Sequence, residues 1–146
     1  MVINQKNKGN NFERDAVKLL MNHIPNSTWK RIPSSGAIGT NIGEPLLCGD
    51  IVGEIEGFPR KFRVEAKVGY GGAKQFTLKK EWIDKIAMEA YQTYSTPFVI
   101  GKFSGAREGT QVFVVLDIDT FSDLLNQITK LQRELDEVTN ANLGRV

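Results

Sequence analysis

The spacing of apolar residues in the first part of the chain predicts a helix followed by a strand. Asn10 and Glu13 have the spacing of a helix capping box, and the apolar residues after them recur at intervals of three or four. Residues 25–27 (Pro-Asn-Ser) interrupt this pattern, so we expect the helix to end near Ile24. The next stretch, Trp29 to Ile32, predicts a short strand.

Alternation of polar and apolar residues then predicts a hairpin. Its two strands, residues 49–56 and 61–68, are separated by a short turn that contains Gly and Pro. In the second strand, apolar side chains alternate with Arg63, Glu65 and Lys67. These three residues therefore share one face of the strand, which brings an acid and an ammonium group side by side.

The second half of the chain predicts two helices and two strands. Thr77 is positioned to cap a helix whose apolar residues follow Trp82 at helical intervals. Residues 97–103 and 111–116 have the composition of strands, and a last helix is expected over about residues 120–138. This order of elements predicts an α/β fold with a central mixed β-sheet flanked by helices.

Length and composition agree with one globular domain. The chain has 146 residues, of which 40% are hydrophobic and 25% charged, close to the averages of soluble proteins. We expect residues 1–119 to form this domain. Residues 120–146 are expected to form a C-terminal helix and tail, attached to the same domain or to a dimer partner. Because no apolar run approaches a membrane span and the N-terminus lacks a signal-peptide core, we expect a cytoplasmic protein without a membrane partner.

The residue types exclude several kinds of chemistry. Cys48 and His23 are the single cysteine and the single histidine of the chain. They leave no internal disulfide framework, no zinc cluster and no histidine-based triad. Any catalysis must therefore use carboxylates, lysine and hydroxyl groups, and nothing in the sequence indicates a small-molecule cofactor.

The net charge of +2 conceals a segmented distribution. Residues 1–33 and 57–80 carry net charges of +4 and +6, whereas residues 34–56 and 81–146 each carry −4. Two basic blocks in an otherwise acidic chain agree with a single face that binds a polyanion such as DNA. They agree equally with two separate solvated surfaces.

The residues that suggest a reaction are Asp50, at the start of one hairpin strand, with Glu65 and Lys67 on its partner strand. If the strands pair, both carboxylates approach one point, and oxygen atoms are the ligands that Mg²⁺ takes. Lys67 lies about 6–7 Å along the strand from Glu65 and can reach the same point. Such a group could activate water against a phosphodiester. The alternative is a turn aspartate followed by a solvated strand face.

Four short motifs add to this picture, and they follow one another within residues 6–118. They are Lys8-Gly9-Asn10-Asn11-Phe12-Glu13-Arg14, Ser35-Gly36, Gly49-Asp50-Ile51-Val52 and Val64-Glu65-Ala66-Lys67. In this order they resemble the archaeal-type Holliday junction resolvases, a branch of the PD-(D/E)XK nuclease superfamily that also occurs in viruses. Two departures are Gly49, where the family has proline, and the loop of residues 36–48, which lacks lysine and arginine.

The resemblance implies a restriction-endonuclease-like fold and a set of site residues. The implied metal ligands are Asp50, Glu65, the backbone carbonyl of Ala66 and, as a further candidate, Glu13. Lys67 would assist the nucleophile, and Ser35 would contact the region of the scissile phosphate. The implied cofactor is Mg²⁺, with Mn²⁺ able to substitute. Glu13 has an alternative role as a helix-capping acid, and Ser34 and Ser35 have the alternative of ordinary loop hydroxyls.

The implied function is a Mg²⁺-dependent endodeoxyribonuclease, a Holliday junction resolvase that makes paired symmetric nicks in four-way DNA during recombination and repair. Two nicks need two active sites, so the resemblance implies a homodimer. Candidate DNA contacts are Lys8, Arg14, Lys30, Arg31, Ser34, Lys74, Lys79 and Lys80. One alternative is an endonuclease for duplex or branched DNA in general. The other is a non-catalytic DNA-binding module with a nuclease fold.

The last predicted helix has no counterpart in this resemblance. Its apolar residues are Phe121, Leu124, Ile128, Leu131, Leu135 and Val138, spaced 3, 4, 3, 4 and 3. This is an a/d pattern over about two and a half heptads. The helix either packs on its own sheet or pairs with the same helix, or another surface, of a second subunit.

Overall fold

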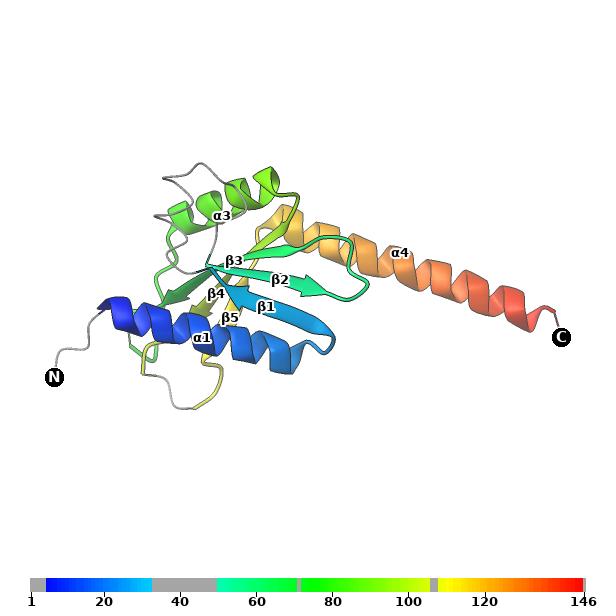
Figure 1. Cartoon of the computed structure of the whole chain (residues 1–146). Helices are drawn as coiled ribbons and strands as arrows, with labels where there is room; N and C mark the ends of the chain where they lie inside the picture. The colour runs from blue at the N-terminus through cyan, green and yellow to red at the C-terminus, as the bar shows by residue number, and fades with distance from the viewer. Residues whose placement is uncertain (1–4, 33–49, 71, 106–107, 146) are drawn as a thin grey trace. The chain divides into compact units, whose positions relative to one another are not determined.

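The structure, a computed structural model, describes residues 5–32, 50–70, 72–105 and 108–145. Its elements are α1 (Gln5–His23), β1 (Ser27–Arg31), β2 (Ile51–Ile55), β3 (Phe62–Val68), α3 (Lys80–Gln92), β4 (Thr96–Lys102), β5 (Val112–Val115) and α4 (Ile118–Leu143) (Figure 1). The order of helices and strands is the one that the sequence predicts.

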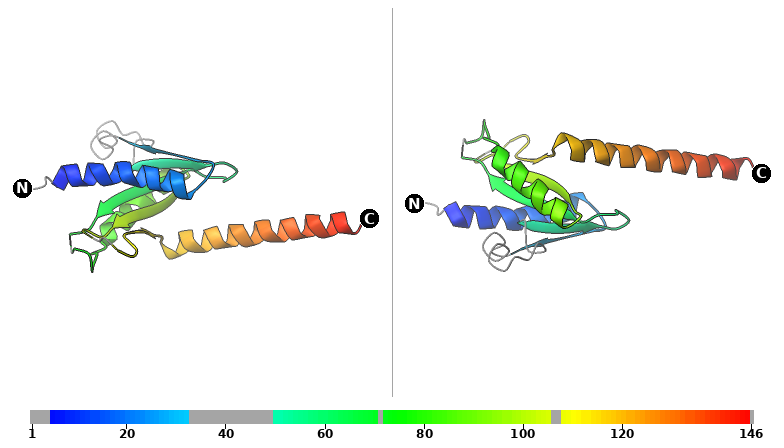
Figure 2. Two further views of the ribbon diagram at one scale, coloured as in Figure 1. Left: turned by 90° about the horizontal axis from the view of Figure 1, so that it is seen from below. Right: turned by 90° about the horizontal axis from the view of Figure 1, so that it is seen from above.

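The five strands form one mixed sheet in the order β1-β2-β3-β4-β5. Strands β3 and β4 are parallel, and the other neighbouring pairs are antiparallel. Helix α3 connects the parallel pair. Helices α1 and α3 cover opposite faces of the sheet, as the views from below and above show (Figure 2). The predicted α/β fold with a central mixed sheet flanked by helices is therefore confirmed.

The main hydrophobic core lies between α1 and the sheet. Helix α1 buries residues spaced four apart, which places them on one face: Phe12, Ala16 and Leu20. On the sheet, the rings of Trp29, Phe62 and Phe98 have centroids 5.6 to 6.1 Å apart. Because side chains alternate along β3, burying Phe62 and Val64 against α1 turns the residues between and after them toward α3. This alternation directs Glu65 and Lys67 to the α3 face.

Two predicted helix starts are wrong. Helix α1 begins at Gln5, so Asn10 lies inside the helix and does not cap it. Helix α3 begins at Lys80 with Lys79 at the N-cap position, two residues after the predicted cap Thr77. A capping-box spacing also occurs within helices, and Gly9 is tolerated inside α1 at a cost of about 1 kcal/mol.

The chain divides into two compact units, Met1–Val115 and Leu116–Val146. The second unit contains the expected C-terminal helix, α4, which has 26 residues and is capped by the side chain of Asp117, an acceptor from Thr120 N. The predicted domain boundary at residue 119, and the attachment of the last segment, stay predictions. Within the described residues, no helix combines the length and apolar character needed to span a membrane.

Candidate active site

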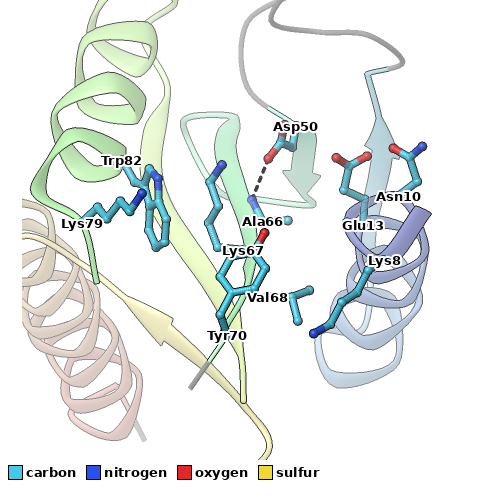
Figure 3. A pocket seen from close by; sticks show the side chains of 11 residues that line it. Lys8, Asn10, Glu13, Asp50, Ala66, Lys67, Val68, Tyr70, Lys79 and Trp82 are labelled. Atoms are coloured by element: carbon cyan, nitrogen blue, oxygen red, sulfur yellow. Dashed lines mark hydrogen bonds between the residues drawn. The ribbon is translucent and has the colours of Figure 1, made fainter. Parts of the chain in front are cut away.

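A polar cavity of about 370 Å³ lies at the end of the sheet, between the first turns of α1 and α3 (Figure 3). Its lining residues are Lys8, Gly9, Asn10, Glu13, Asp50, Ala66, Lys67, Val68, Tyr70, Lys79 and Trp82. Three segments that the sequence analysis singled out thus meet here: the start of α1, Asp50 before β2, and the second half of β3.

Asp50 is held by its backbone on both sides. Its N–H donates to the Val64 carbonyl at 3.0 Å, and its carbonyl accepts from Ile32 N–H at 2.9 Å. Its side chain turns toward β3, where Oδ2 accepts from the N–H of Ala66 at 2.9 Å. In a strand, the N–H and C=O of one residue point to the same side, so the carbonyl of Ala66 also points toward the Asp50 side.

The electrostatic surroundings of Asp50 disfavour its negative charge. Burial, together with the negative charge of Glu65, raises the pKa of Asp50 from 3.8 to about 6. The negative charge of Glu13 acts in the same direction, and the N–H of Ala66 opposes it. A bound cation would relieve this repulsion between the carboxylates.

Glu65 is adjacent to Asp50 but has a different environment. Its side chain is only 3% exposed, and its Oε1 lies 3.0 Å from the ammonium of Lys67. Its Oε2 accepts at 3.5 Å from the ammonium of Lys85, which comes from α3. Burial alone would lower the pKa of Lys85, but the carboxylates of Glu65 and Glu89 raise it above its usual value. The negative charge of Glu65 is therefore balanced by the ammonium groups of two lysines.

Glu13 lies in the middle of α1 and lines the cavity. Its Oε2 accepts from Nε of Arg31 at 2.9 Å and lies 2.8 Å from Nη2 of the same guanidinium. The alternative role of Glu13 as a helix-capping acid is wrong, because α1 begins eight residues earlier, at Gln5. Arg31 enters the site as a partner of Glu13.

The predicted DNA contacts divide into three groups. Lys8 and Lys79 line the cavity. Arg31 and Lys80 are paired with acids, Glu13 and Asp84 respectively. The remaining cations are exposed and are not part of the cavity lining: Arg14, Lys30 and Lys74. Ser34 and Ser35, like Cys48, lie outside the described residues.

The donor atoms of the site fit a hard divalent cation. The carboxylates of Asp50 and Glu65 and the carbonyl of Ala66 are oxygen donors, which is the ligand type that Mg²⁺ prefers. Among the described residues, no group of three His, Cys, Asp or Glu side chains is arranged to hold a metal. The fit therefore depends on two carboxylates and a backbone oxygen, and Glu65 would exchange a lysine contact for the metal.

Three residues of this site were not assigned to it from the sequence. Lys85 follows Trp82 by three residues, and this spacing puts both on the side of α3 that faces β3. That spacing was a usable signal, but the pairing of Lys85 with Glu65 depends on the fold. Trp82 was predicted as part of an apolar helix face, and Tyr70 follows the predicted strand of residues 61–68. Both line the cavity.

The α/β fold and the acids and lysine on neighbouring strands define a nuclease of the PD-(D/E)XK class. A family model described as "Phage putative PDDEXK endonuclease" matches residues 4–143, and the chain belongs to this family. The structure is similar to that of Hjc, a Holliday junction resolvase from the archaeal hyperthermophile Archaeoglobus fulgidus. The TM-score is 0.48 with 20% sequence identity, over 70% of this chain and 72% of that one. No curated protein sequence matches significantly.

Proposed function

We propose that this nuclease is a Mg²⁺-dependent endodeoxyribonuclease that resolves four-way DNA junctions by paired, symmetric nicks. The observation that carries the proposal is one cavity lined by Asp50, Ala66 and Lys67, with the carboxylate of Glu65 at 3.0 Å from the Lys67 ammonium. The order of motifs along the chain, which is that of the archaeal-type resolvases, supports the junction as the substrate.

Asp50, Glu65 and the Ala66 carbonyl would hold the metal, and Glu13 would add negative charge to the same wall of the cavity. When bound, Mg²⁺ supplies a Lewis acid that lowers the pKa of water and stabilises charge on phosphate oxygens. The Ala66 N–H fixes the orientation of the Asp50 carboxylate at 2.9 Å, so this ligand is preorganised.

Lys67 would act on the phosphate and on the attacking water. Its side chain is about one-third exposed and lines the cavity, and its ammonium lies 3.0 Å from Oε1 of Glu65. A cation held in this way can orient water or neutralise the charge that develops on the phosphate without reorganising during the reaction. Lys8 and Lys79 on the two sides of the cavity would hold the flanking phosphates.

Two symmetric nicks in one junction require two sites related by a two-fold axis, and a homodimer supplies them. Phosphate contacts give affinity and register without reading bases, which suits recognition of the shape of the junction.

The test is a cleavage assay with a four-way junction, a linear duplex and a single strand, each with and without Mg²⁺. We expect paired nicks in the junction, and we expect this cleavage to require Mg²⁺. The cleavage rate should fall by roughly 100-fold or more in each of the variants Asp50→Asn, Glu65→Gln and Lys67→Ala. Binding to the junction should persist in the two acid variants. Asp84→Asn is the matched control, because Asp84 is an exposed acid on α3 outside the cavity lining.

A salt series distinguishes the junction resolvase from a general nuclease. Nonspecific binding to phosphates falls steeply with salt. We expect the preference for the junction to persist at a salt concentration where duplex binding has collapsed. Equal affinity for junction and duplex at every salt concentration would favour the general endonuclease, and binding without cleavage in Mg²⁺ would favour the non-catalytic module.

A further inference from the structure

Two aromatic side chains line the cavity that contains Asp50 and Lys67. Tyr70 lies two residues after the end of β3 and is 74% exposed. Trp82 lies in the first turn of α3 and is partly buried. In the close view, Trp82 lies on the α3 side of the cavity, and the Tyr70 ring lies between Lys67 and Lys8 (Figure 3).

The two rings alternate with ammonium groups. The ammonium of Lys8 lies 5.6 Å from the centroid of the Tyr70 ring. Trp82 has Lys67 at 5.2 Å and Lys79 at 5.8 Å from its ring. These distances fall within the range of cation–π attraction, so the rings and cations hold one another in place.

The Trp82 ring also packs against an aromatic cluster of the protein. It packs edge-on against Phe76 with ring centroids 6.0 Å apart, and Phe76 itself packs against Phe113 at 4.8 Å. Tyr70 has no such support among the described aromatic contacts. A single exposed aromatic residue is ordinary on a protein surface. The location of Tyr70 is unusual, because it lies on the wall of a cavity that two carboxylates and three lysines also line.

Alternating cations and aromatic faces are the chemistry of binding to unstacked nucleotides, since ammonium groups pair with phosphates and rings stack on bases. The cavity volume of about 370 Å³ lies within the range for pockets that take small organic groups, roughly 300 to 1,000 Å³. A base within a continuous duplex is covered on both faces by its neighbours and cannot stack on a side chain. At a branch point, stacking is interrupted and a base face is available.

We infer that Tyr70 forms a subsite that stacks on an unstacked nucleobase beside the scissile phosphate of branched DNA, with Trp82 positioning Lys67 and Lys79 in the same cavity. This inference rests on the proposed function and adds a reason for the selectivity: the site favours DNA whose bases near the cut are unstacked. Lys8 and Lys79 then contact the phosphates on either side of that nucleotide.

Tyr70 is the residue to change, because Trp82 also contacts the proposed catalytic Lys67. Dissociation constants of the full-length protein are measured in EDTA for a four-way junction, a linear duplex and oligo(dT). We expect Tyr70→Ala to weaken binding to the junction and to oligo(dT) by roughly tenfold, with less than a twofold change for the duplex. Tyr70→Phe, which keeps the ring, should bind like the wild type.

Tyr91→Ala is the matched control, since Tyr91 is 86% exposed and lies at the other end of α3, outside the cavity lining. It should leave all three affinities unchanged. Circular dichroism checks that each variant folds. A second readout is 2-aminopurine at the branch point, whose fluorescence should be more quenched by the wild type than by Tyr70→Ala. Equal affinities of Tyr70→Ala and the wild type, or an equal loss in Tyr91→Ala, would overturn the subsite.

The failure of this inference can be distinguished from failure of the proposed function. A wild-type protein that neither cuts nor prefers the junction refutes the proposed function alone. The oligo(dT) comparison still tests the subsite in that case, because a single strand offers unstacked bases. A loss of oligo(dT) affinity in Tyr70→Ala then supports the subsite, and unchanged affinity refutes it.

Discussion

The ammonium of Lys85 on α3 lies 3.5 Å from Oε2 of Glu65 on β3, whereas the ammonium of Lys67 lies 3.0 Å from Oε1 of the same carboxylate. Glu65 is thus a buried acid with a cation at each oxygen. A metal that binds Glu65 competes with these lysines for the same lone pairs. We therefore expect Lys85 to stabilise the metal-free protein and to oppose metal binding.

Lys85→Gln should separate these two effects. Removing one cation from a buried carboxylate destabilises the fold, and because Lys67 remains and Lys85 is half-exposed, we expect a loss of roughly 1–2 kcal/mol in EDTA. The same change should tighten Mg²⁺ binding by a few-fold or roughly tenfold, since less positive charge faces the metal. Urea unfolding and isothermal titration calorimetry measure the two quantities.

Lys80→Gln is the control for this prediction, because Lys80 is an exposed lysine on the same helix that pairs with Asp84. It should change neither stability nor Mg²⁺ affinity appreciably. If Lys85→Gln behaves like Lys80→Gln in both measurements, the contact with Glu65 has no energetic role.

The raised pKa of Asp50 predicts a pH-dependent gain in stability for Asp50→Asn. The pKa is about 6 in the folded protein against an ordinary value of 3.8, so the folded state binds the proton more tightly. Ionised Asp50 therefore destabilises the metal-free fold above about pH 6, and this penalty disappears near pH 4. In EDTA at pH 7.5, Asp50→Asn should be more stable than the wild type by roughly 1–3 kcal/mol.

Asn keeps an oxygen that can accept from the Ala66 N–H, so the variant tests the charge and not the hydrogen bond. Urea unfolding at pH 4, 5, 6 and 7.5 gives the difference in unfolding free energy at each pH. We expect it to grow with pH. A variant that is less stable than the wild type at pH 7.5 would contradict the assignment of a raised pKa.

Local patterns predicted the strands better than the starts of the helices. Strands β2 and β3 follow from a period of two in the hairpin, and their pairing brings Asp50 near Glu65 as expected. The start of α1 did not follow, because Asn10 and Glu13 satisfy a capping-box pattern that the helix, extended back to Gln5, does not use.

The sequence also did not predict the ion-pair partners of the site residues. Glu13 pairs with Arg31, 18 residues away, and Lys85 pairs with Glu65, 20 residues away on another element. Such contacts depend on which faces of α1, α3 and the sheet meet. Opposite charges are too common along a chain to identify one pair by composition.

The indole ring of Trp29 covers Gly53 on β2 and leaves no room for a side chain at this position. Gly53 pairs with Trp29 of β1, and a Cβ atom at Gly53 would lie 2.1 Å from Cε3 of that indole. Trp29 is buried and packs against Phe62 and Phe98, so it has little room to move. Gly53→Ala should therefore lower the free energy of unfolding by roughly 1–3 kcal/mol, or more. Urea unfolding measures this loss.

Gly9→Ala is the matched control for this substitution. Apart from its chain neighbours and the backbone of its own helix, no atom of the described residues lies within 4 Å of a Cβ built at Gly9, which is inside α1. The same Gly→Ala change should here stabilise the protein by about 0.5–1 kcal/mol through helix propensity. A Gly53→Ala protein as stable as the wild type would show that Trp29 can move aside.

The apolar stripe of α4 predicts an association between subunits. In the outer half of this helix, Leu131 and Leu135 are 64% and 59% exposed, and Ile128 and Val138 continue the same line. Their spacing is that of a coiled-coil seam. So short a coil is marginal alone and needs support from a main dimer interface. Replacing Leu131 and Leu135 together by Asp should weaken the dimer while the rest of the protein stays folded.

Sedimentation velocity and thermal melting followed by circular dichroism measure the two effects separately. Asn126→Asp with Asn140→Asp is the control, because these exposed residues lie on α4 away from the stripe and add the same charge. A weaker dimer with an unchanged melting curve in the Leu variant, and no change in the control, supports pairing between subunits. A lower melting temperature at unchanged association indicates instead that the stripe packs on its own domain. If neither quantity changes, the stripe serves neither purpose, because two buried aspartates would disturb any apolar contact that Leu131 and Leu135 make.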